Sequence, residues 1–134
     1  LQAASEAANE KSMLIIAVTV LTSMDHKELA AIGITTPMEE QVLRLARIAA
    51  ENGLDGVVCS AWEITPLRDA LGTNFRLITP GIRPANSQKD DQKRVMTPAQ
   101  AAAAGSDFIV VGRPITKAED PEAAARQIRE ELEA

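Results

Sequence analysis

Four short apolar runs constrain the fold most strongly. They are rich in valine and isoleucine, mostly continuous rather than alternating, and cover Leu14–Leu21, Leu54–Cys59, Phe75–Ile78 and Phe108–Val111. A strand that is buried on both faces has this pattern, and a parallel sheet covered by helices is built from such strands. The runs therefore predict a buried parallel sheet.

A polar residue followed by proline marks the start of a helix after each run. The signals are Thr36-Pro37-Met38-Glu39, Thr65-Pro66, Thr97-Pro98-Ala99-Gln100 and Asp120-Pro121. The polar side chain can cap free N–H groups, proline suits the first helical position, and a Glu or Gln three residues on completes a capping box. Glycines can end the first three of these helices, at Gly53, Gly72 and Gly105. An alanine-rich helix is also expected at Leu1–Asn9, so the order is one helix and then four strand–helix units.

Four such units amount to half of a TIM (β/α)₈ barrel. Roughly 120 residues cover them, or about 30 for each unit, and a whole barrel of about 250 residues has the same pitch. Right-handed crossovers make successive strands neighbours in one sheet. We therefore predict an α/β half barrel. A doubly wound open sheet is the alternative.

A half barrel by itself leaves two open strand edges and one uncovered sheet face, which is an aggregation hazard. We therefore infer that another segment or chain supplies the missing half. The alanine-rich start has no N-cap before it, as expected for a cut through a larger structure.

Composition excludes several kinds of partner. The chain has 134 residues and a net charge of −5, and its few aromatic residues offer no stacking platform, so nucleic acid is not expected. No apolar run is long enough to span a membrane. One cysteine, Cys59, fits a reducing cytoplasm, and with a single histidine, His26, there is no credible metal set. Cys59 is expected to be a buried thiol, His26 a surface residue and Trp62 a packing residue.

Two loops at the predicted ligand end of the sheet carry a glycine and then an arginine. They are Thr79–Pro84 and Gly112–Thr116. Glycine lets the backbone approach a ligand, and an arginine can fork onto phosphate oxygens. The alternative is that the glycines only form turns and the arginines lie on a solvated rim. Because two such loops follow adjacent strands, we favour phosphate binding.

Further polar residues are expected at this end. The polar stretch Ala85–Val95 is typical of a lid, in which Gln92 could bond a phosphate or a carbonyl. We interpret Lys89 and its charged neighbours as solvated surface. Thr22 and Ser23 follow the first strand, where their hydroxyls could equally contact a substrate or form a turn. Asp55 and Asp107 precede their strands, at the end of a barrel that is associated with stability.

Four segments of the chain resemble bacterial orotidine 5'-phosphate decarboxylases. They are residues 14–24 (LIIAVTVLTSM), 53–61 (GLDGVVCSA), 77–84 (LITPGIRP) and 110–116 (VVGRPIT). The likeness covers essentially the whole chain and runs along the C-terminal half of that family. The pairing of Thr-Pro-Gly-Ile-Arg-Pro with Gly-Arg-Pro-Ile-Thr is specific, whereas related phosphate-binding barrels share the Gly-Arg ending. The resemblance implies that residues 1–134 form the C-terminal half of one barrel domain.

The resemblance also implies a function. The family converts orotidine 5'-phosphate to UMP and CO₂, the last step of pyrimidine biosynthesis, without a metal or organic cofactor, as a cytoplasmic homodimer. The matching substrate-binding positions are the phosphate arginine Arg113, the backbone donor Gly112, the lid glutamine Gln92, the lid-start contact Arg83 and the hydroxyl residue Thr22, with Ser23 a less certain companion.

One part of the family pattern is absent. The Asp-x-Lys-x-x-Asp motif has no match here, and neither do the earlier Asp and Lys of its charge cluster. We therefore expect no catalytic residue in this stretch and no activity of the chain alone. A non-catalytic phosphate-binding half barrel or scaffold, and a related sugar-phosphate decarboxylase, are the alternative hypotheses.

Overall fold

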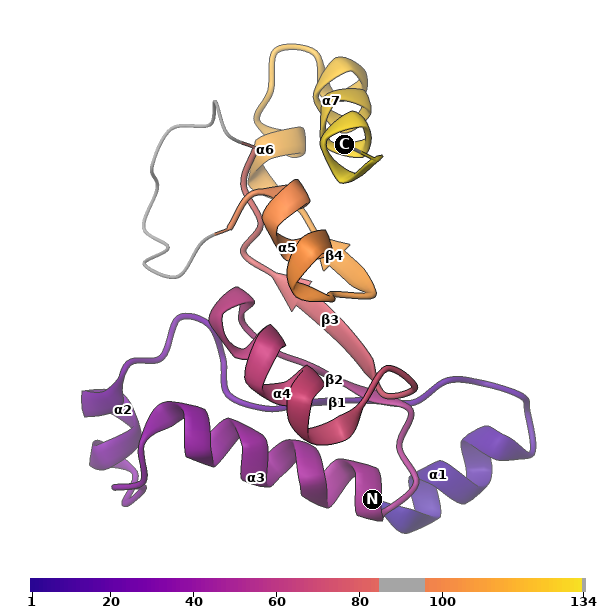
Figure 1. Ribbon diagram of the computed structural model, residues 1–134, viewed down its shortest axis with the longest axis vertical. Coiled ribbons are helices and arrows are strands. Elements are labelled where there is room, and N and C mark those ends of the chain that lie inside the picture. Colours follow the sequence, from indigo (N-terminus) through magenta and orange to yellow (C-terminus); the bar gives the residue numbers. More distant parts are fainter. Residues whose placement is uncertain (85–95, 134) are drawn as a thin grey trace.

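The computed structural model describes residues 1–84 and 96–133 (Figure 1). Helices and strands alternate along most of the chain. In order they are α1 (Gln2–Asn9), β1 (Ile16–Val18), α2 (His26–Ala31), α3 (Met38–Glu51), β2 (Gly56–Val58), the 3₁₀ helix η1 (Ala61–Glu63), α4 (Ile64–Leu71), β3 (Arg76–Pro80), α5 (Pro98–Ala104), β4 (Phe108–Val110), α6 (Arg113–Thr116) and α7 (Pro121–Glu133).

The four strands form one parallel sheet in the order β1-β2-β3-β4. Each strand therefore pairs with the next along the chain, as in a β/α barrel. In a doubly wound sheet the strand order would reverse at a switch point. Within the described residues there is no such reversal, so the alternative fold is wrong.

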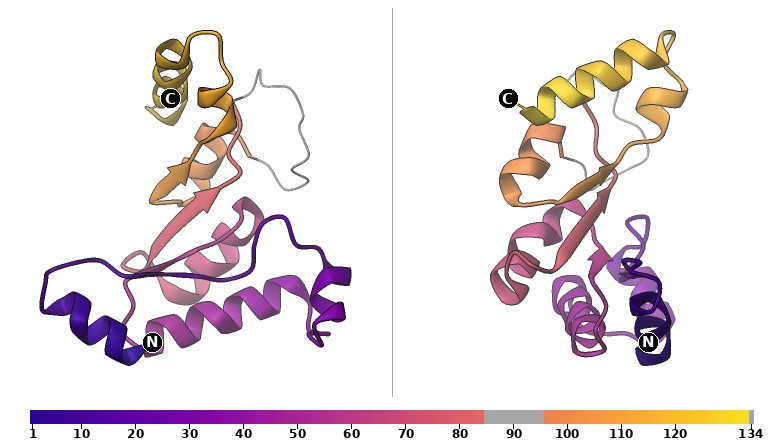
Figure 2. Two further views of the ribbon diagram at one scale, coloured as in Figure 1. Left: turned by 180° about the vertical axis from the view of Figure 1, so that it is seen from behind. Right: turned by 90° about the vertical axis from the view of Figure 1, so that its right-hand side faces the viewer.

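Helices cover one face of this sheet. The row Ala17, Val57 and Leu77 runs across β1, β2 and β3, and Val57 and Leu77 are buried. α3, α4, α5 and α7 pack against one another in succession along this side (Figure 2). The core of the molecule lies between the sheet and these helices.

The other face of the sheet is open. The next row contains Val18, Val58, Ile78 and Phe108, and Val18 and Phe108 are 61% and 54% exposed. Val110, two residues after Phe108 in β4 and on the same face, is 51% exposed. The apolar runs predicted burial on both faces, but within the described residues no layer covers this side. An uncovered face is what a half barrel is expected to have.

Two of the predicted helix starts are confirmed by their caps. The Thr97 hydroxyl accepts a hydrogen bond from Gln100 N at 3.2 Å, and the Gln100 side chain accepts from Thr97 N at 3.0 Å. Asp120 accepts from Ala123 N at 3.0 Å. These caps satisfy N–H groups that lack partners within the helix.

The other two starts differ from the prediction. Pro37, not Thr36, is the N-cap of α3, without a side-chain cap. α4 is preceded by η1, whose capping box joins Ser60 and Glu63, so Thr65 lies inside the first turn of α4. Ser60 N donates to the Glu63 carboxylate at 2.7 Å. The helical segment is therefore capped at Ser60, before the expected start at Thr65.

Two short helices were not predicted. α2 begins after Asp25, whose carboxylate caps the N–H groups of Lys27 and Glu28, while α6 follows β4 after only Val111 and Gly112. Neither has a long apolar periodic pattern. None of the helices within residues 1–84 and 96–133 has the length and apolar content needed to cross a membrane.

Candidate functional site

The two predicted arginine loops leave the same end of adjacent strands. Pro80 of β3 is paired in register with Val110 of β4. Arg83 and Arg113 each lie three positions beyond this pair. Because the strands are parallel, both loops begin at the same edge of the sheet, and both side chains are half-buried. The predicted common location of the two loops is confirmed.

The backbone of the first loop is held in place. Gly81 has a φ of +79°, a conformation that residues with a Cβ rarely adopt. Ile82 is buried and forms a parallel bridge with Met96, and Arg83 N donates to Met96 O at 3.0 Å. The path from β3 to Arg83 is therefore fixed by a glycine turn and by pairing with the start of the next unit.

The second loop turns at once into α6. Gly112 is the N-cap, and its carbonyl accepts from Ile115 N at 2.9 Å and Thr116 N at 3.0 Å. A Cβ built on Gly112 would meet no other atom within 4 Å. The described part of the chain thus leaves space beside this backbone, and Arg113 starts from a short, hydrogen-bonded helix.

Thr22 and Ser23 occupy the middle of a turn after β1. Met24 N donates to Leu21 O at 2.9 Å across them, and Thr22 is half-buried whereas Ser23 is exposed. The turn interpretation is confirmed, and a substrate contact stays a prediction. The turn lies at the same end of the sheet as the arginine loops, because β1 is parallel to β3 and β4.

The remaining site predictions have different outcomes. Gln92 and Lys89 lie outside the described residues. His26 is exposed, as expected. Trp62 was expected to pack but is largely exposed, because it stands on the outer side of η1. Within the described residues, no three His, Cys, Asp or Glu side chains are grouped as metal ligands.

Cys59 is a structural thiol at the end of β2. Its side chain is fully buried, and this burial raises the pKa of the thiol to about 12. Thiolate is the reactive form, so Cys59 is not a nucleophile at neutral pH. The expectation of a small buried thiol is confirmed.

Two carboxylates hold the opposite end of the strands. Asp55, before β2, accepts from Ile15 N at 2.7 Å, and Asp107, before β4, accepts from Leu77 N at 2.8 Å. Each therefore ties its strand to the preceding one. The assignment of both residues to a stabilising end is supported by these contacts.

Sequence reasoning missed the buried polar pair at the end of β2. Ser60 and Glu63 are both buried, and their capping box shapes the loop between the Thr22 turn and the Arg83 loop. The spacing Ser-x-x-Glu could have revealed this box. It was overlooked because Thr65-Pro66 offers a competing start signal.

The comparisons agree with this geometry. The model of the family described as "Orotidine 5'-phosphate decarboxylase / HUMPS family" matches residues 1–128. An orotidine 5'-phosphate decarboxylase of Gluconobacter oxydans is 62% identical over 125 residues, covering 93% of this chain and 53% of the relative. One from Photobacterium profundum is 59% identical over 119 residues, covering 89% and 52%.

Solved structures give the same result. The orotidine 5'-phosphate decarboxylase from Lactobacillus acidophilus has a TM-score of 0.77 and 44% identity over 91% of this chain and 50% of that one. The enzyme from Pyrococcus horikoshii has a TM-score of 0.66 and 26% identity, covering 96% and 55%. The chain spans about half the length of the curated relatives it matches. The chain therefore belongs to the orotidine 5'-phosphate decarboxylase / HUMPS family, and its fold is half of the family's TIM barrel.

Proposed function

We propose that the chain is the phosphate-binding half of an orotidine 5'-phosphate decarboxylase, which converts orotidine 5'-phosphate to UMP and CO₂ in pyrimidine biosynthesis. One observation carries the proposal. Arg83 and Arg113 follow paired positions of adjacent parallel strands, in a chain whose relatives are orotidine 5'-phosphate decarboxylases. Two guanidinium groups from one edge can together bind the oxygens of a phosphate.

The role of this half is to hold the substrate rather than to break its bond. Arg113 and Arg83 bind the phosphate, and Gly112 offers its backbone in the space beside it. Gln92 and Thr22 contact the nucleotide by analogy with the family. Binding energy from a phosphate far from the reacting carbon can be used to order the reacting end and to exclude water from it.

The catalytic Asp and Lys residues come from the other half of the barrel. Residues 1–134 are the C-terminal half of one domain, and the open sheet face supports this division. Val18, Phe108 and Val110 would line the interior of an eight-stranded barrel, which is filled with branched and bulky side chains. The completed enzyme is a cytoplasmic homodimer, as the resemblance implies.

The test joins this chain to the part of the Gluconobacter oxydans relative that it does not match. Decarboxylation of orotidine 5'-phosphate is then followed by its change in absorbance. In this enzyme Arg113→Ala should lower kcat/KM by about 10- to 150-fold, because a forked charged contact contributes roughly 1.5–3 kcal/mol. Arg126→Ala, in an exposed ion pair with Glu122, is the matched control and should stay within about twofold.

Three outcomes would contradict the proposal. If Arg113→Ala left kcat/KM within about twofold of the unmodified enzyme, the phosphate role would be wrong. If the joined protein bound UMP but decarboxylated nothing, a binding module would be the better reading. Stronger inhibition by ribose 5-phosphate than by UMP would instead favour a sugar-phosphate decarboxylase.

A further inference from the structure

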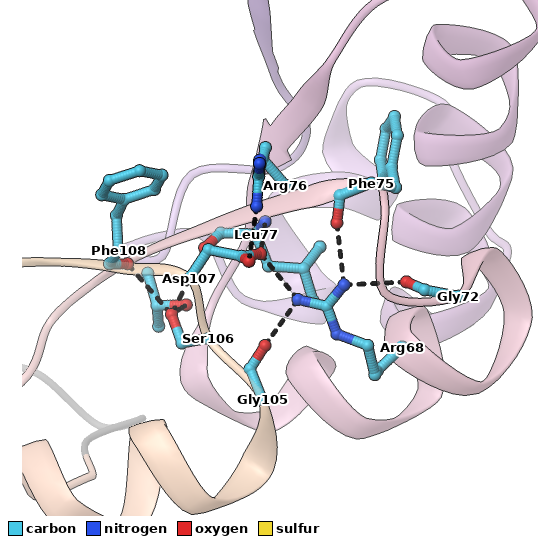
Figure 3. Close-up of polar contacts among 10 residues, drawn as sticks. Arg68, Gly72, Phe75, Arg76, Leu77, Gly105, Ser106, Asp107 and Phe108 are labelled. Carbon is cyan, nitrogen blue, oxygen red and sulfur yellow. Dashed lines mark hydrogen bonds and ion pairs between the residues drawn. The ribbon is translucent and has the colours of Figure 1, made fainter.

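Arg68 joins four segments of the chain at the end of the sheet opposite the arginine loops (Figure 3). From α4, its Nη1 donates to the carbonyls of Gly72 and Phe75, both at 2.8 Å. Its Nη2 donates to the carbonyl of Gly105 and, at 2.7 Å, to the carboxylate of Asp107. The Arg68 side chain is only 15% exposed. One largely buried guanidinium therefore contacts all four acceptors.

The acceptors lie at the ends of helices and the starts of strands. Gly72 and Gly105 are the C-caps of α4 and α5, where carbonyls lack partners within the helix and carry partial negative charge. Phe75 directly precedes β3 and Asp107 directly precedes β4. One cation thus caps two helices and ties the two strands together.

Asp107 completes the connection between the strands. Its carboxylate accepts from Leu77 N in β3 and pairs with Arg68, and also with Arg76 at 3.3 Å. The Arg76 side chain is 46% exposed, so its pair contributes little. Arg68 and Leu77 are the contacts through which Asp107 fixes the start of β4 to β3.

The same two strands carry the arginines of the candidate site at their other end. β4 has three residues, and Arg113 follows it after only Val111 and Gly112. Such a short strand has few ladder bonds of its own to fix its position. The alignment of Arg113 with Arg83 therefore depends on how firmly the start of β4 is held.

We propose that Arg68 is a positioning residue for the Arg83 and Arg113 site. It fixes β4 against β3 from the far end of the sheet and so sets the relative placement of the two loops. The identity of the ligand rests on the proposed function. The coupling between the two ends of β3 and β4 does not depend on it.

Hydrogen exchange on the full 134-residue chain tests the coupling. Arg68→Met keeps an apolar stem of similar length and removes all the donors. The amides of Ile115, Thr116 and Lys117, bonded within the α6 turn, should exchange at least about fivefold faster, while those of α3 are unchanged. Arg126→Met removes an exposed arginine from α7 and should change neither set. If exchange became faster only at Gly105, Leu77 and their immediate neighbours, the inference would be overturned.

Ligand binding separates positioning from a general loss of structure. In calorimetric titrations, Arg68→Met should weaken binding of 5'-UMP at least about threefold and leave binding of uridine unchanged, since uridine has no phosphate to bridge the loops. If Arg68→Met weakened the binding of 5'-UMP and of uridine equally, Arg68 would not act by positioning the two arginine loops. If the unmodified chain binds neither, the proposed function fails for this chain, and the exchange result alone decides the coupling. If Arg68→Met does not fold, Asp107→Asn, which keeps the shape of the acceptor, should show the same pattern with smaller changes.

Discussion

The two faces of the sheet are similar in sequence and different in structure. Leu77 and Ile78 are neighbours in β3, yet Leu77 points to the helix-covered face and is buried, while Ile78 belongs to the row that includes the exposed Phe108. Both faces carry aliphatic side chains. An apolar strand sequence therefore indicates that both faces of the sheet are suited to packing. It does not show that both faces are covered in this chain.

The largest expected contrast between the faces is in thiol reactivity. Cys59 is buried with a thiol pKa of about 12, whereas a cysteine placed by Val110→Cys would lie on the open face. At about pH 8 the introduced thiol, with an ordinary pKa near 8.5, should react with iodoacetamide at least roughly a thousandfold faster. Peptide mass spectrometry measures both rates in one protein. If the two thiols reacted with iodoacetamide at rates within tenfold of each other, the two faces of the sheet would not differ in how accessible they are to the reagent.

Truncating neighbouring residues of one strand should affect stability unequally. Leu77→Ala removes a fully buried side chain and should lower the free energy of unfolding by about 2–5 kcal/mol. Ile78→Ala, the matched change on the open face, should cost clearly less because Ile78 is only half-buried. Urea denaturation of both variants provides the values. If both variants lost the same free energy of unfolding, the row that contains Ile78 would also be packed in solution.

Asp107 ties β3 and β4 together at the base of the sheet, and its effect should depend on pH. Partial burial by itself raises the pKa of Asp107, but the Leu77 N–H and the contacts with Arg68 and Arg76 outweigh it, so the pKa lies below its ordinary value. A lowered pKa means that the stabilisation is present above the ordinary aspartate pKa of about 3.9 and is lost as the pH falls through the lower folded value.

Asp107→Asn should therefore remove about 1.5 kcal/mol of stability near neutral pH and flatten the loss of stability in acid. Unfolding in urea at about pH 6 and at about pH 3 gives both quantities. Asp120→Asn is a control, since that carboxylate caps the exposed end of α7. An unchanged acid profile in Asp107→Asn would exclude this carboxylate as the titrating group.

The smallest effect is expected on the open face. Phe108→Ser replaces a half-exposed ring and should change the free energy of unfolding of this chain by no more than about 0.5 kcal/mol. In the completed barrel the same change should cost several times more, because Phe108 would then be enclosed. Urea denaturation of the chain and of the completed barrel, each with and without the substitution, measures both losses. A large loss in the chain alone would show that the face is already covered, for instance by a second copy.

Prediction from the sequence was best where the controlling contacts are local. The Thr97 and Asp120 caps act within three residues, so their signals lie in the adjacent sequence. The α4 start was misplaced because the Ser60–Glu63 box competed with a similar signal nearby. Arg68 was not identified, because its partners Gly105 and Asp107 are 37 and 39 residues away in sequence.

The sequence alone predicted the four strands, the starts of α5 and α7, the glycine ends of α4 and α5, and the two loops in which a glycine precedes an arginine. These features depend on backbone geometry and hydrogen bonds within a few residues of each other. The tertiary structure was needed to show that Pro80 is paired with Val110, that the row of Val18 and Phe108 lies on the open face, and that Arg68 holds the base of β3 and β4. Those outcomes depend on strand register and on contacts between distant segments, which local patterns do not encode.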